Sequence, residues 1–356
     1  MASPPLRNLY PRITSFANLL AAAHRAQKGK RYRPDVLAFN ANLEAELFGL
    51  QRELLRQTYT PGPYRQFRIR DPKPRLISAA PYRDRVVHHA LIAVVAPPLE
   101  RRFLATSYAN RVGFGSHRAL RKFARACKEY RWVLQVDIRL YFPSIDHQIL
   151  MGQLRDRISC TETLWLLERI LANGAVPGPA IDSFPGDSLL TPLERARGLP
   201  IGNLSSQFLA NFHLDRFDHT VRCLEGIRTY LRYVDDCALF ADQKEPLLRA
   251  KLRIEQELAF LRLRPHPLKT QIRRTRDGAS FVGFHVVRGI IRVRNHNLIR
   301  GRRRLKRHGL GVTSGLIPLE EARVSLLSWN AHLAHGHTQR RRQRLYQGLA
   351  FAPEVW

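Results

Sequence analysis

The chain has 356 residues and a strong excess of positive charge. Lys and Arg number 59 against 29 Asp and Glu, so the formal net charge is +30 at pH 7. With 44% hydrophobic and 25% charged residues, the composition is that of a globular protein and excludes a disordered basic tail. A folded chain this basic favours a polyanionic partner, because Lys and Arg neutralise phosphates. The composition therefore argues against an ordinary metabolic enzyme and favours nucleic acid over a membrane surface.

The cysteines and the apolar runs indicate where the protein acts. Cys127, Cys160, Cys223 and Cys237 form no CxxC pair, so we expect reduced and buried thiols, with no disulfide framework. The longest apolar runs, such as residues 90–96, fall short of the roughly 20 residues that a membrane span requires. The N-terminus lacks the apolar core of a signal peptide. The sequence predicts a cytoplasmic protein with no membrane partner.

The first third of the chain is predicted to be mostly helical. Apolar residues recur every three or four positions over residues 16–59 and again over residues 83–103, where the helix is expected to end near Pro97 and Pro98. Between these segments, residues 64–80 carry β-branched and aromatic residues on both sides of an Asp-Pro-Lys-Pro turn at 71–74. This arrangement predicts a β-hairpin.

Strands and helices alternate in the rest of the chain. Residues 132–138 predict a buried strand that ends in an acidic residue, and the Gly- and Pro-rich residues 174–197 predict an exposed loop. The further predictions, in chain order, are a helical segment at 202–224, a hairpin at 227–241, an amphipathic helix at 251–263, a last hairpin at 280–294 and basic helices after 295.

Acidic residues stand at the ends of two predicted strands in a chain that is short of acids. Asp137 ends the first strand, and Asp235 and Asp236 lie between the arms of the later hairpin. If one sheet brings them together, their carboxylates can hold two Mg²⁺ ions about 4 Å apart, the arrangement that nucleotidyl transfer requires. Taken alone, an Asp-Asp pair is more often a solvated turn.

The acidic residues belong to a series of ordered motifs. Together these motifs resemble a reverse transcriptase over roughly residues 7–345. They are Lys73-Pro-Arg-Leu-Ile-Ser78, Arg83-Asp-Arg-Val-Val-His-His-Ala-Leu91, Ser107-Tyr-Ala-Asn-Arg-Val-Gly113, Asp137-Ile-Arg-Leu-Tyr-Phe-Pro-Ser-Ile-Asp-His147, Leu199-Pro-Ile-Gly-Asn-Leu-Ser-Ser-Gln207, Tyr233-Val-Asp-Asp236, Leu268-Lys-Thr270 and Phe281-Val-Gly-Phe284.

The resemblance implies an α+β right-hand polymerase fold with fingers, palm and thumb. The expected parts are a helical N-terminal extension at 1–66, fingers at 67–130, a palm with interleaved fingers segments at 131–295 and a basic helical thumb at 296–356. The implied enzyme is an RNA-directed DNA polymerase that uses two Mg²⁺ ions, for which Mn²⁺ is expected to substitute. Its partners would be a structured template RNA, a DNA or RNA primer, the cDNA product and dNTPs.

The resemblance also assigns roles at the reaction centre. Asp137 and Asp235 match the metal ligands, Asp236 matches the accompanying carboxylate, and Ile138 matches a backbone-carbonyl ligand. Phe142 matches the aromatic residue that packs under the incoming sugar and excludes a 2′-hydroxyl. Deoxynucleotides are therefore the expected substrates.

Further positions match nucleotide and nucleic-acid contacts. Arg75 resembles the fingers arginine that grips the triphosphate, with Lys73 assisting, and an arginine fork suits phosphate oxygens. Lys269 resembles the lysine near the triphosphate, and Ile201 and Gln207 are expected at the nucleotide site. Solvated surface cations are the alternative for the lysines. The residues expected to contact nucleic acid are Arg111 on the template path and, in the thumb, Arg302, Arg303, Arg304, Lys306, Arg340, Arg341 and Arg342.

Three other residues within these motifs are assigned structural roles. His88 and His89 point in different directions on a helix, so they do not predict a metal pair. Asp146 is predicted to cap the helix that follows the active-site strand.

The residues at 201 and 207 indicate the type of reverse transcriptase. Most related families carry Gln and Pro there, whereas this chain has Ile201 and Gln207. This combination resembles the bacterial or phage-encoded enzymes of diversity-generating retroelements, which copy a template-repeat RNA into DNA hypermutated at adenines and work with a small basic accessory protein, expected as an oligomer. The alternatives are a related enzyme of antiphage defence, a retron or group II intron enzyme, and a catalytically idle RNA-binding scaffold. A group II intron enzyme is disfavoured because only 61 residues follow Asn295.

Overall fold

The computed structural model describes residues 4–70, 74–178 and 182–346, which form two compact units. The first unit contains the described residues up to Asn110 together with Ile138–Val221 and Leu252–His266. The second contains Arg111–Asp137, Arg222–Lys251 and the described residues from Pro267 onwards.

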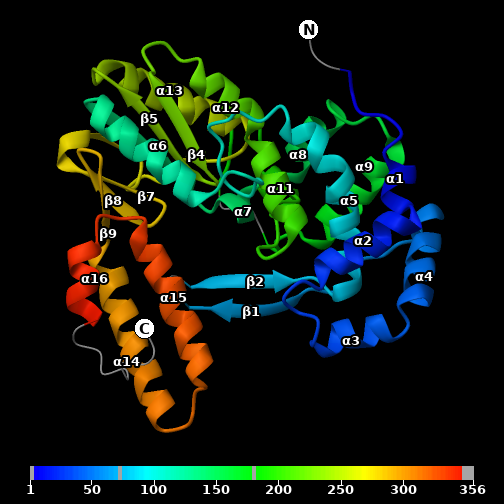
Figure 1. Ribbon diagram of the computed structural model, residues 1–356. Helices are drawn as coiled ribbons and strands as arrows, with labels where there is room; N and C mark the ends of the chain where they lie inside the picture. The colour runs from blue at the N-terminus through cyan, green and yellow to red at the C-terminus, as the bar shows by residue number, and fades with distance from the viewer. Residues whose placement is uncertain (1–3, 71–73, 179–181, 347–356) are drawn as a thin grey trace. The chain divides into compact units, whose positions relative to one another are not determined.

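The first unit is mainly helical and is organised around α5 (Tyr82–Glu100). This helix is apolar on nearly all sides, so it is buried between α2 and α11 (Figure 1). The other helices of this unit are α1 (Tyr10–Thr14), α2 (Phe16–Ala26), α3 (Pro34–Ala41), α4 (Leu43–Leu55), α7 (Tyr141–Ser144), α8 (His147–Arg155), α9 (Thr161–Asn173), α10 (Thr191–Glu194), α11 (Leu204–His213) and nearly all of α12 (Asp215–Arg222).

Helix α5 ends close to the predicted position, with Pro97 and Pro98 in its last turn and Glu100 as its last residue. The stretch that was predicted to be mostly helical over residues 16–59 contains several helices, and a break at Asn42, whose φ of −124° and ψ of 39° are not helical, separates α3 from α4.

The predicted hairpin of the fingers region is confirmed. Strands β1 (Arg65–Ile69) and β2 (Arg75–Ala79) pair antiparallel, with Ile69 opposite Arg75. Most of the predicted Asp-Pro-Lys-Pro turn, residues 71–73, lies outside the described residues.

The second unit contains a four-stranded antiparallel sheet with the strand order β4-β5-β3-β6. Helix α6 (Ser116–Glu129) packs on this sheet through its apolar side, where Phe123 contacts the rings of Phe240 and Phe281. The sheet strands are β3 (Trp132–Asp137), β4 (Thr229–Tyr233), β5 (Asp236–Ala241) and β6 (Gln271–Arg274), and α13 (Glu245–Phe260) spans both units.

A three-stranded meander follows η1 (Thr275–Asp277), where the sequence predicted a hairpin. Val282 and Gly283, with φ of 41° and 87°, form an additional tight turn between the first two strands. The strands are β7 (Ala279–Phe281), β8 (Phe284–Val287) and β9 (Ile290–Val293).

The C-terminal helices confirm the prediction of a helical segment after Asn295. They are α14 (Asn295–Thr313), α15 (Leu319–Ala334) and α16 (Gln339–Tyr346). Gly301 allows α14 to approach α15 closely, since a Cβ atom there would lie 2.1 Å from the Trp329 ring.

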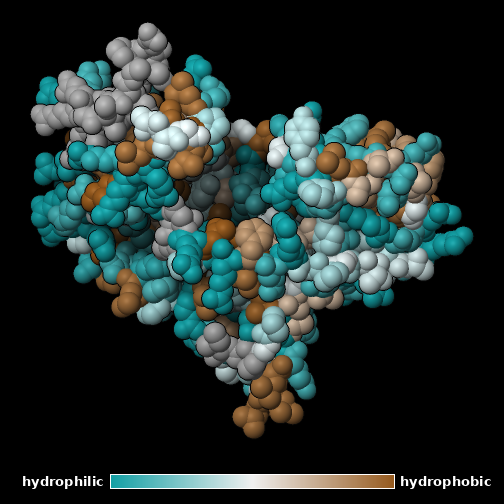
Figure 2. Space-filling model, turned by 90° about the horizontal axis from the view of Figure 1, so that it is seen from below, coloured by the Kyte–Doolittle hydropathy of each residue, from teal (hydrophilic) through white to brown (hydrophobic). Residues whose placement is uncertain are grey.

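The face shown in Figure 2 is mostly hydrophilic with scattered apolar residues. No helix in the described part of the chain is long and apolar enough to span a bilayer. Cys127, Cys160 and Cys237 are buried as predicted, but Cys223 is exposed. The prediction was wrong at Cys223 because this residue follows the last residue of α12, in a turn that leaves the core.

Candidate active site

Strand pairing brings the predicted carboxylates together in the second unit. Strand β3 pairs antiparallel with β5, and the register places Asp137 directly opposite Asp236. Strands β4 and β5 are joined by a two-residue turn, Val234 and Asp235, with Tyr233 paired to Asp236. The end of one strand and the tip of one hairpin therefore form a single acidic site.

The turn that carries Asp235 has a strained backbone. Val234 has a φ of 59°, which is unusual for a β-branched residue and costs about 1–3 kcal/mol. Arg232, although 1% exposed, donates a hydrogen bond from Nη1 to the Val234 carbonyl at 3.1 Å. The sequence reasoning missed this support, although an arginine within an apolar strand was a visible signal for it.

The site concentrates negative charge. The pKa of Asp236 is raised to about 7 by burial, followed by the charges of Asp235 and Asp137. Lys269 and Arg294 oppose this rise. Lys269 Nζ donates to both carboxylate oxygens of Asp137, at 2.8 and 2.9 Å, and so provides part of the positive charge that the site attracts.

The donor chemistry fits a hard divalent cation. Mg²⁺ is usually held by one or two carboxylates, with water and substrate phosphates completing its ligands. Asp137 and Asp235 supply such oxygens, and the ammonium on Asp137 shows that this carboxylate attracts a cation. No cluster of three or more His, Cys, Asp or Glu side chains suited to a metal occurs among residues 4–70, 74–178 and 182–346.

Phe142 lies in the first unit on the short helix α7. Leu140, with a φ of 48°, begins the turn into this helix, and the buried Tyr141 hydroxyl donates to the carbonyl of Ala210 in α11. The Phe142 ring is half-buried and lies edge-on to Tyr141, with their centroids 5.8 Å apart. The backbone carbonyl of Phe142 accepts a hydrogen bond from Leu199 N at 2.8 Å, and this bond joins α7 to the segment that contains Ile201.

Ile201 lies beside the strand that carries Arg75. The Ile201 carbonyl accepts a hydrogen bond from Ser78 N at 3.0 Å. Buried Asn203 donates to the Ser78 carbonyl at 2.8 Å and accepts from Ala80 N at 3.2 Å. The Ile201 side chain is half-buried, and Arg75 is exposed on β2. The loop and the hairpin strand are thus fixed to each other, and sequence reasoning did not identify Asn203 as the link.

Gly202 makes the close approach of this loop possible. It has a φ of 118°, a conformation that L side chains rarely adopt, and a Cβ atom there would lie 2.9 Å from Ile77 Cγ2. A larger residue would therefore separate the loop from β2.

Several other predicted site residues lie outside this arrangement or have other partners. Lys73 is outside the described residues, and Gln207 is half-buried on α11. Ile138 is 1% exposed and bridges Pro265. The Arg111 guanidinium lies 4.0 Å from the centroid of the Phe114 ring.

The arginines that were predicted to lie in a thumb differ in exposure. Arg340 is exposed, whereas Arg342 is half-buried and donates from Nη1 to Asn330 Oδ1 at 2.9 Å. Arg341 lies on α16, and nothing is described of its side chain. The predicted contact residues Arg302, Arg303, Arg304 and Lys306 are exposed on α14, as are Arg300 and Arg307.

The residues that were assigned structural roles have structural contacts. His88 is fully buried with Nδ1 3.3 Å from Ser205 Oγ, and burial is the main reason why the pKa values of His88 and His89 fall to about 4. Asp146 Oδ1 accepts a hydrogen bond from Ile149 N at 3.0 Å, which confirms that Asp146 caps α8.

Asp146 also belongs to a buried ionic cluster that the sequence did not reveal. Arg262 Nη1 donates to Asp146 Oδ2 at 2.7 Å, and Arg195 Nε lies 3.5 Å from the same oxygen. Arg195 also pairs with Asp187. The cluster fixes the described end of the predicted exposed loop to the start of α8.

The chain is similar to several known proteins. The chain is 28% identical over 342 residues to protein YkfC of Escherichia coli (strain K12), a match that covers 83% of this chain and 82% of that protein. It is 25% identical over 167 residues to the group II intron-encoded protein LtrA of Lactococcus lactis subsp. cremoris, covering 46% of this chain and 26% of LtrA. A solved chain of the partial Cas6-RT-Cas1--Cas2 complex matches 71% of this chain and 41% of its own length, with 22% identity and a TM-score of 0.40.

The family comparison covers β2, the four-stranded sheet and the acidic site. The model described as "Reverse transcriptase (RNA-dependent DNA polymerase)" matches residues 69–286, more than half of the chain. The predicted α+β right-hand polymerase fold and the predicted nucleotidyltransferase activity are thereby confirmed. The chain belongs to the reverse transcriptase family of RNA-dependent DNA polymerases.

Proposed function

We propose that this RNA-directed DNA polymerase copies a template-repeat RNA into cDNA in a diversity-generating retroelement, with mutation directed to adenines. The observation that carries the catalytic part is the pairing of Asp137 with Asp236 beside the strained turn of Asp235. The retroelement part is supported by Ile201 and Gln207 in the Leu199–Gln207 segment.

In this proposal, Asp137 and Asp235 hold the divalent ions and Asp236 completes the acidic site. Bound Mg²⁺ would lower the pKa of the primer 3′-hydroxyl and stabilise charge on the leaving pyrophosphate. Lys269, which pairs with Asp137, exchanges this partner for the triphosphate when a nucleotide binds. Arg75 and Lys73 grip the triphosphate, while Phe142 fixes the sugar.

The primary experiment measures Mg²⁺-dependent dNTP incorporation on an RNA template with a DNA primer. Incorporation supports the polymerase assignment, and its absence in the presence of Mg²⁺, of Mn²⁺ and of any accessory protein contradicts it. The neighbouring genes decide the biological role. An adjacent template repeat and variable-protein gene support the retroelement, whereas defence genes favour the antiphage alternative.

A second candidate is a reverse transcriptase of the group II intron type, because the chain is similar to LtrA and to nuclear intron maturase 1 of Arabidopsis thaliana. These matches cover 26% and 13% of those proteins, so they support a shared polymerase core. Splicing of a flanking intron RNA by the purified protein would favour this candidate.

Replacing Phe142 with Ala is expected to admit ribonucleotides while deoxynucleotide synthesis continues. The half-buried ring would otherwise occupy the space that a 2′-hydroxyl needs, and steric discrimination of this kind is worth roughly 10–200-fold. The ratio of kcat/KM for dNTP to that for rNTP should fall by about 10-fold or more. Phe142→Tyr keeps the ring and should retain the wild-type ratio, and an unchanged ratio in Phe142→Ala would show that another residue forms the gate.

Replacing Ile201 with Gln is expected to lower misincorporation opposite template adenine several-fold. Isoleucine has no donor or acceptor, whereas an amide here could contribute a hydrogen bond worth about 1 kcal/mol near the nascent base pair. The measurement is sequencing of products made on an adenine-containing RNA template, with Ile201→Leu as the control that changes shape only. Equal error rates at adenine in wild type and Ile201→Gln would reject the role of Ile201.

Neutralising the exposed arginines of α14 is expected to weaken binding to template–primer. A variant with Arg302, Arg303 and Arg304 replaced by Gln should flatten the slope of log K against log salt by roughly one unit for each phosphate that the helix no longer neutralises. The matched control is Arg323→Gln on α15, which removes a cation paired with Glu320 at 3.5 Å. A wild-type slope in the triple variant would assign the α14 arginines to solubility.

A further inference from the structure

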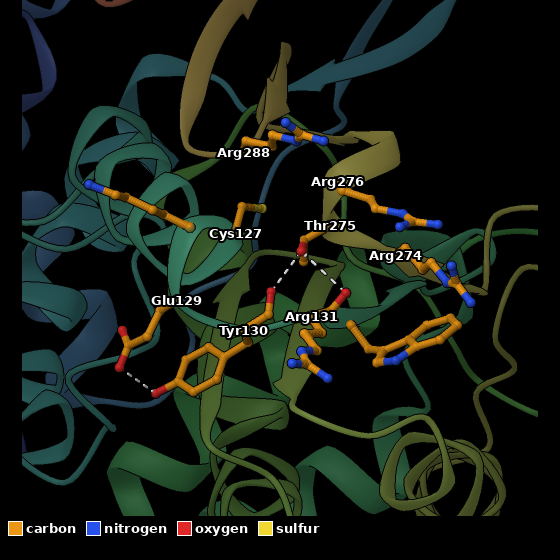
Figure 3. A pocket seen from close by; sticks show the side chains of 10 residues that line it. Cys127, Glu129, Tyr130, Arg131, Arg274, Thr275, Arg276 and Arg288 are labelled. Atoms are coloured by element: carbon orange, nitrogen blue, oxygen red, sulfur yellow. Dashed lines mark hydrogen bonds between the residues drawn. The ribbon is translucent and has the colours of Figure 1, made fainter.

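The second unit contains a basic cavity at the opposite end of β3 from Asp137. Its volume is about 670 Å³, within the range of ligand pockets, and Figure 3 shows the side chains that line it. Trp132 begins β3 and Asp137 ends it, so the two residues are separated by about 16 Å at the usual rise per residue. The acidic site and the basic cavity are therefore distinct sites on one strand.

The cavity walls combine cations with aromatic rings. Its lining residues are Cys127, Lys128, Glu129, Tyr130, Arg131, Trp132, Arg274, Thr275, Arg276 and Arg288. Five of these side chains are cationic and one is a carboxylate. The Arg274 guanidinium lies 5.2 Å from the Trp132 ring centroid, and Lys244 Nζ approaches the same ring at 5.8 Å.

The framework of the cavity is rigid. Thr275 Oγ1 donates to the Tyr130 carbonyl at 2.6 Å and to the Arg131 carbonyl at 3.2 Å (Figure 3). Thr275 N also donates to the Arg131 carbonyl, at 3.0 Å. These bonds hold η1 against the chain segment that joins α6 to β3. The cavity is thus preformed, which reduces the entropic cost of binding a ligand.

Most of the cations have no carboxylate partner. No Asp or Glu of the described residues lies within ion-pair distance of Lys128, Arg131 or Arg288, while Arg276 reaches only its neighbour Asp277, at 3.7 Å. Charged residues often protect an edge strand such as β6 from pairing with other chains. That role needs neither a concave surface nor half-buried aromatic rings, so it does not account for the cavity.

The basic surface continues beyond the cavity. Lys128 and Arg288 also line a second hollow of about 420 Å³, together with Arg121 and Arg125 on the exposed side of α6. The two hollows share Lys128 and Arg288 and are therefore adjacent, and we refer to them together as the groove.

We propose that this groove binds single-stranded RNA, with phosphates on Arg131, Arg276 and Arg288 and a base against Trp132. Proteins commonly bind single-stranded nucleic acids in cationic grooves lined with aromatic rings, because each base offers a face on which a ring can stack. Glu129 favours RNA over DNA, since its carboxylate can accept a hydrogen bond from a 2′-hydroxyl. The groove would hold an unpaired segment of the template RNA outside the region being copied, so the proposal rests on the proposed function for the identity of its partner.

The test measures the affinity for RNA of proteins that all carry Asp235→Asn, so that binding is measured in the absence of DNA synthesis. The groove variant replaces Arg131, Arg276 and Arg288 with Gln, all exposed positions that should not affect folding. The matched control removes the same charge at three exposed positions, Arg228→Gln, Arg249→Gln and Arg253→Gln. The probes are an unstructured RNA, DNA of the same sequence and an RNA duplex.

The groove variant should bind the single-stranded RNA on the order of 100-fold more weakly near 0.1 M salt, with the salt slope flattened by about 2. The control variant should lose far less affinity, and ultraviolet crosslinking of RNA to the parent should give adducts at Trp132 or Tyr130. Equal affinity of the groove and control variants, adducts confined to other regions, or equal binding of DNA or duplex would overturn the proposal. Failure of the polymerase assignment would appear separately, as absence of dNTP incorporation by the wild-type protein.

Discussion

Replacing Asp235 with Asn should abolish DNA synthesis and leave RNA binding intact. The substitution keeps the shape of the side chain but removes a charged oxygen ligand, and metal stabilisation of the transition state is worth several kcal/mol. A loss of that size corresponds to a fall in kcat of about three orders of magnitude. Asp137→Asn should have the same effect, because Asp137 faces the same site through the pairing of β3 with β5.

The control for both variants is Asp242→Asn. Asp242 directly follows β5, is exposed and lies 3.5 Å from Arg228. The Asp242→Asn substitution therefore removes the same charge at a position outside the acidic site. Single-turnover incorporation and RNA affinity should be measured for all three variants. Wild-type turnover in Asp235→Asn or Asp137→Asn would reject the acidic site, and loss of RNA binding together with synthesis would point to a folding defect.

Replacing Asp146 with Asn is expected to lower the free energy of unfolding of the first unit by about 3 kcal/mol. The Asp146 side chain is 1% exposed, and removing one partner of a buried ion pair typically costs about 3–5 kcal/mol. The lower value is expected because Arg262 keeps 25% exposure and can be partly hydrated. Asn caps a helix about as well as Asp, so this variant isolates the ionic contribution from the cap.

Thermal and urea unfolding measure this effect, with Asp277→Asn as an exposed control. Asp146→Ala should destabilise by about 1 kcal/mol more than Asp146→Asn, since it also removes the bond to Ile149 N. Wild-type stability in Asp146→Asn would mean that Arg262 and Arg195 are satisfied without this carboxylate.

The sequence by itself determined the features that depend on local pattern and on charge. The sequence predicted the apolar strand before Asp137, the two strands around Tyr233–Asp236 and the basic C-terminal helices. It could do so because the hydrophobic periodicity of strands and helices is visible in consecutive residues. The ordered motifs also led to the reverse transcriptase family, which the family comparison confirmed. The capping role of Asp146 followed from its position before a helix.

The tertiary structure decided which distant residues meet. Only strand pairing places Asp137 opposite Asp236. The link from Asn203 to Ser78 joins positions 125 residues apart. Contacts of this kind depend on loop closure and on the burial of polar groups, which no local pattern of residues encodes.

The same reason explains the groove at the start of β3. Its cations come from α6, the residue before β3, β6, η1 and the turn after β8, and each of them alone resembles an ordinary solvated residue. Composition sets the total charge of the chain, but the fold concentrates part of that charge around two aromatic rings. The local density of charge is a property of the assembled sheet and helices, so it could be recognised only in the structure.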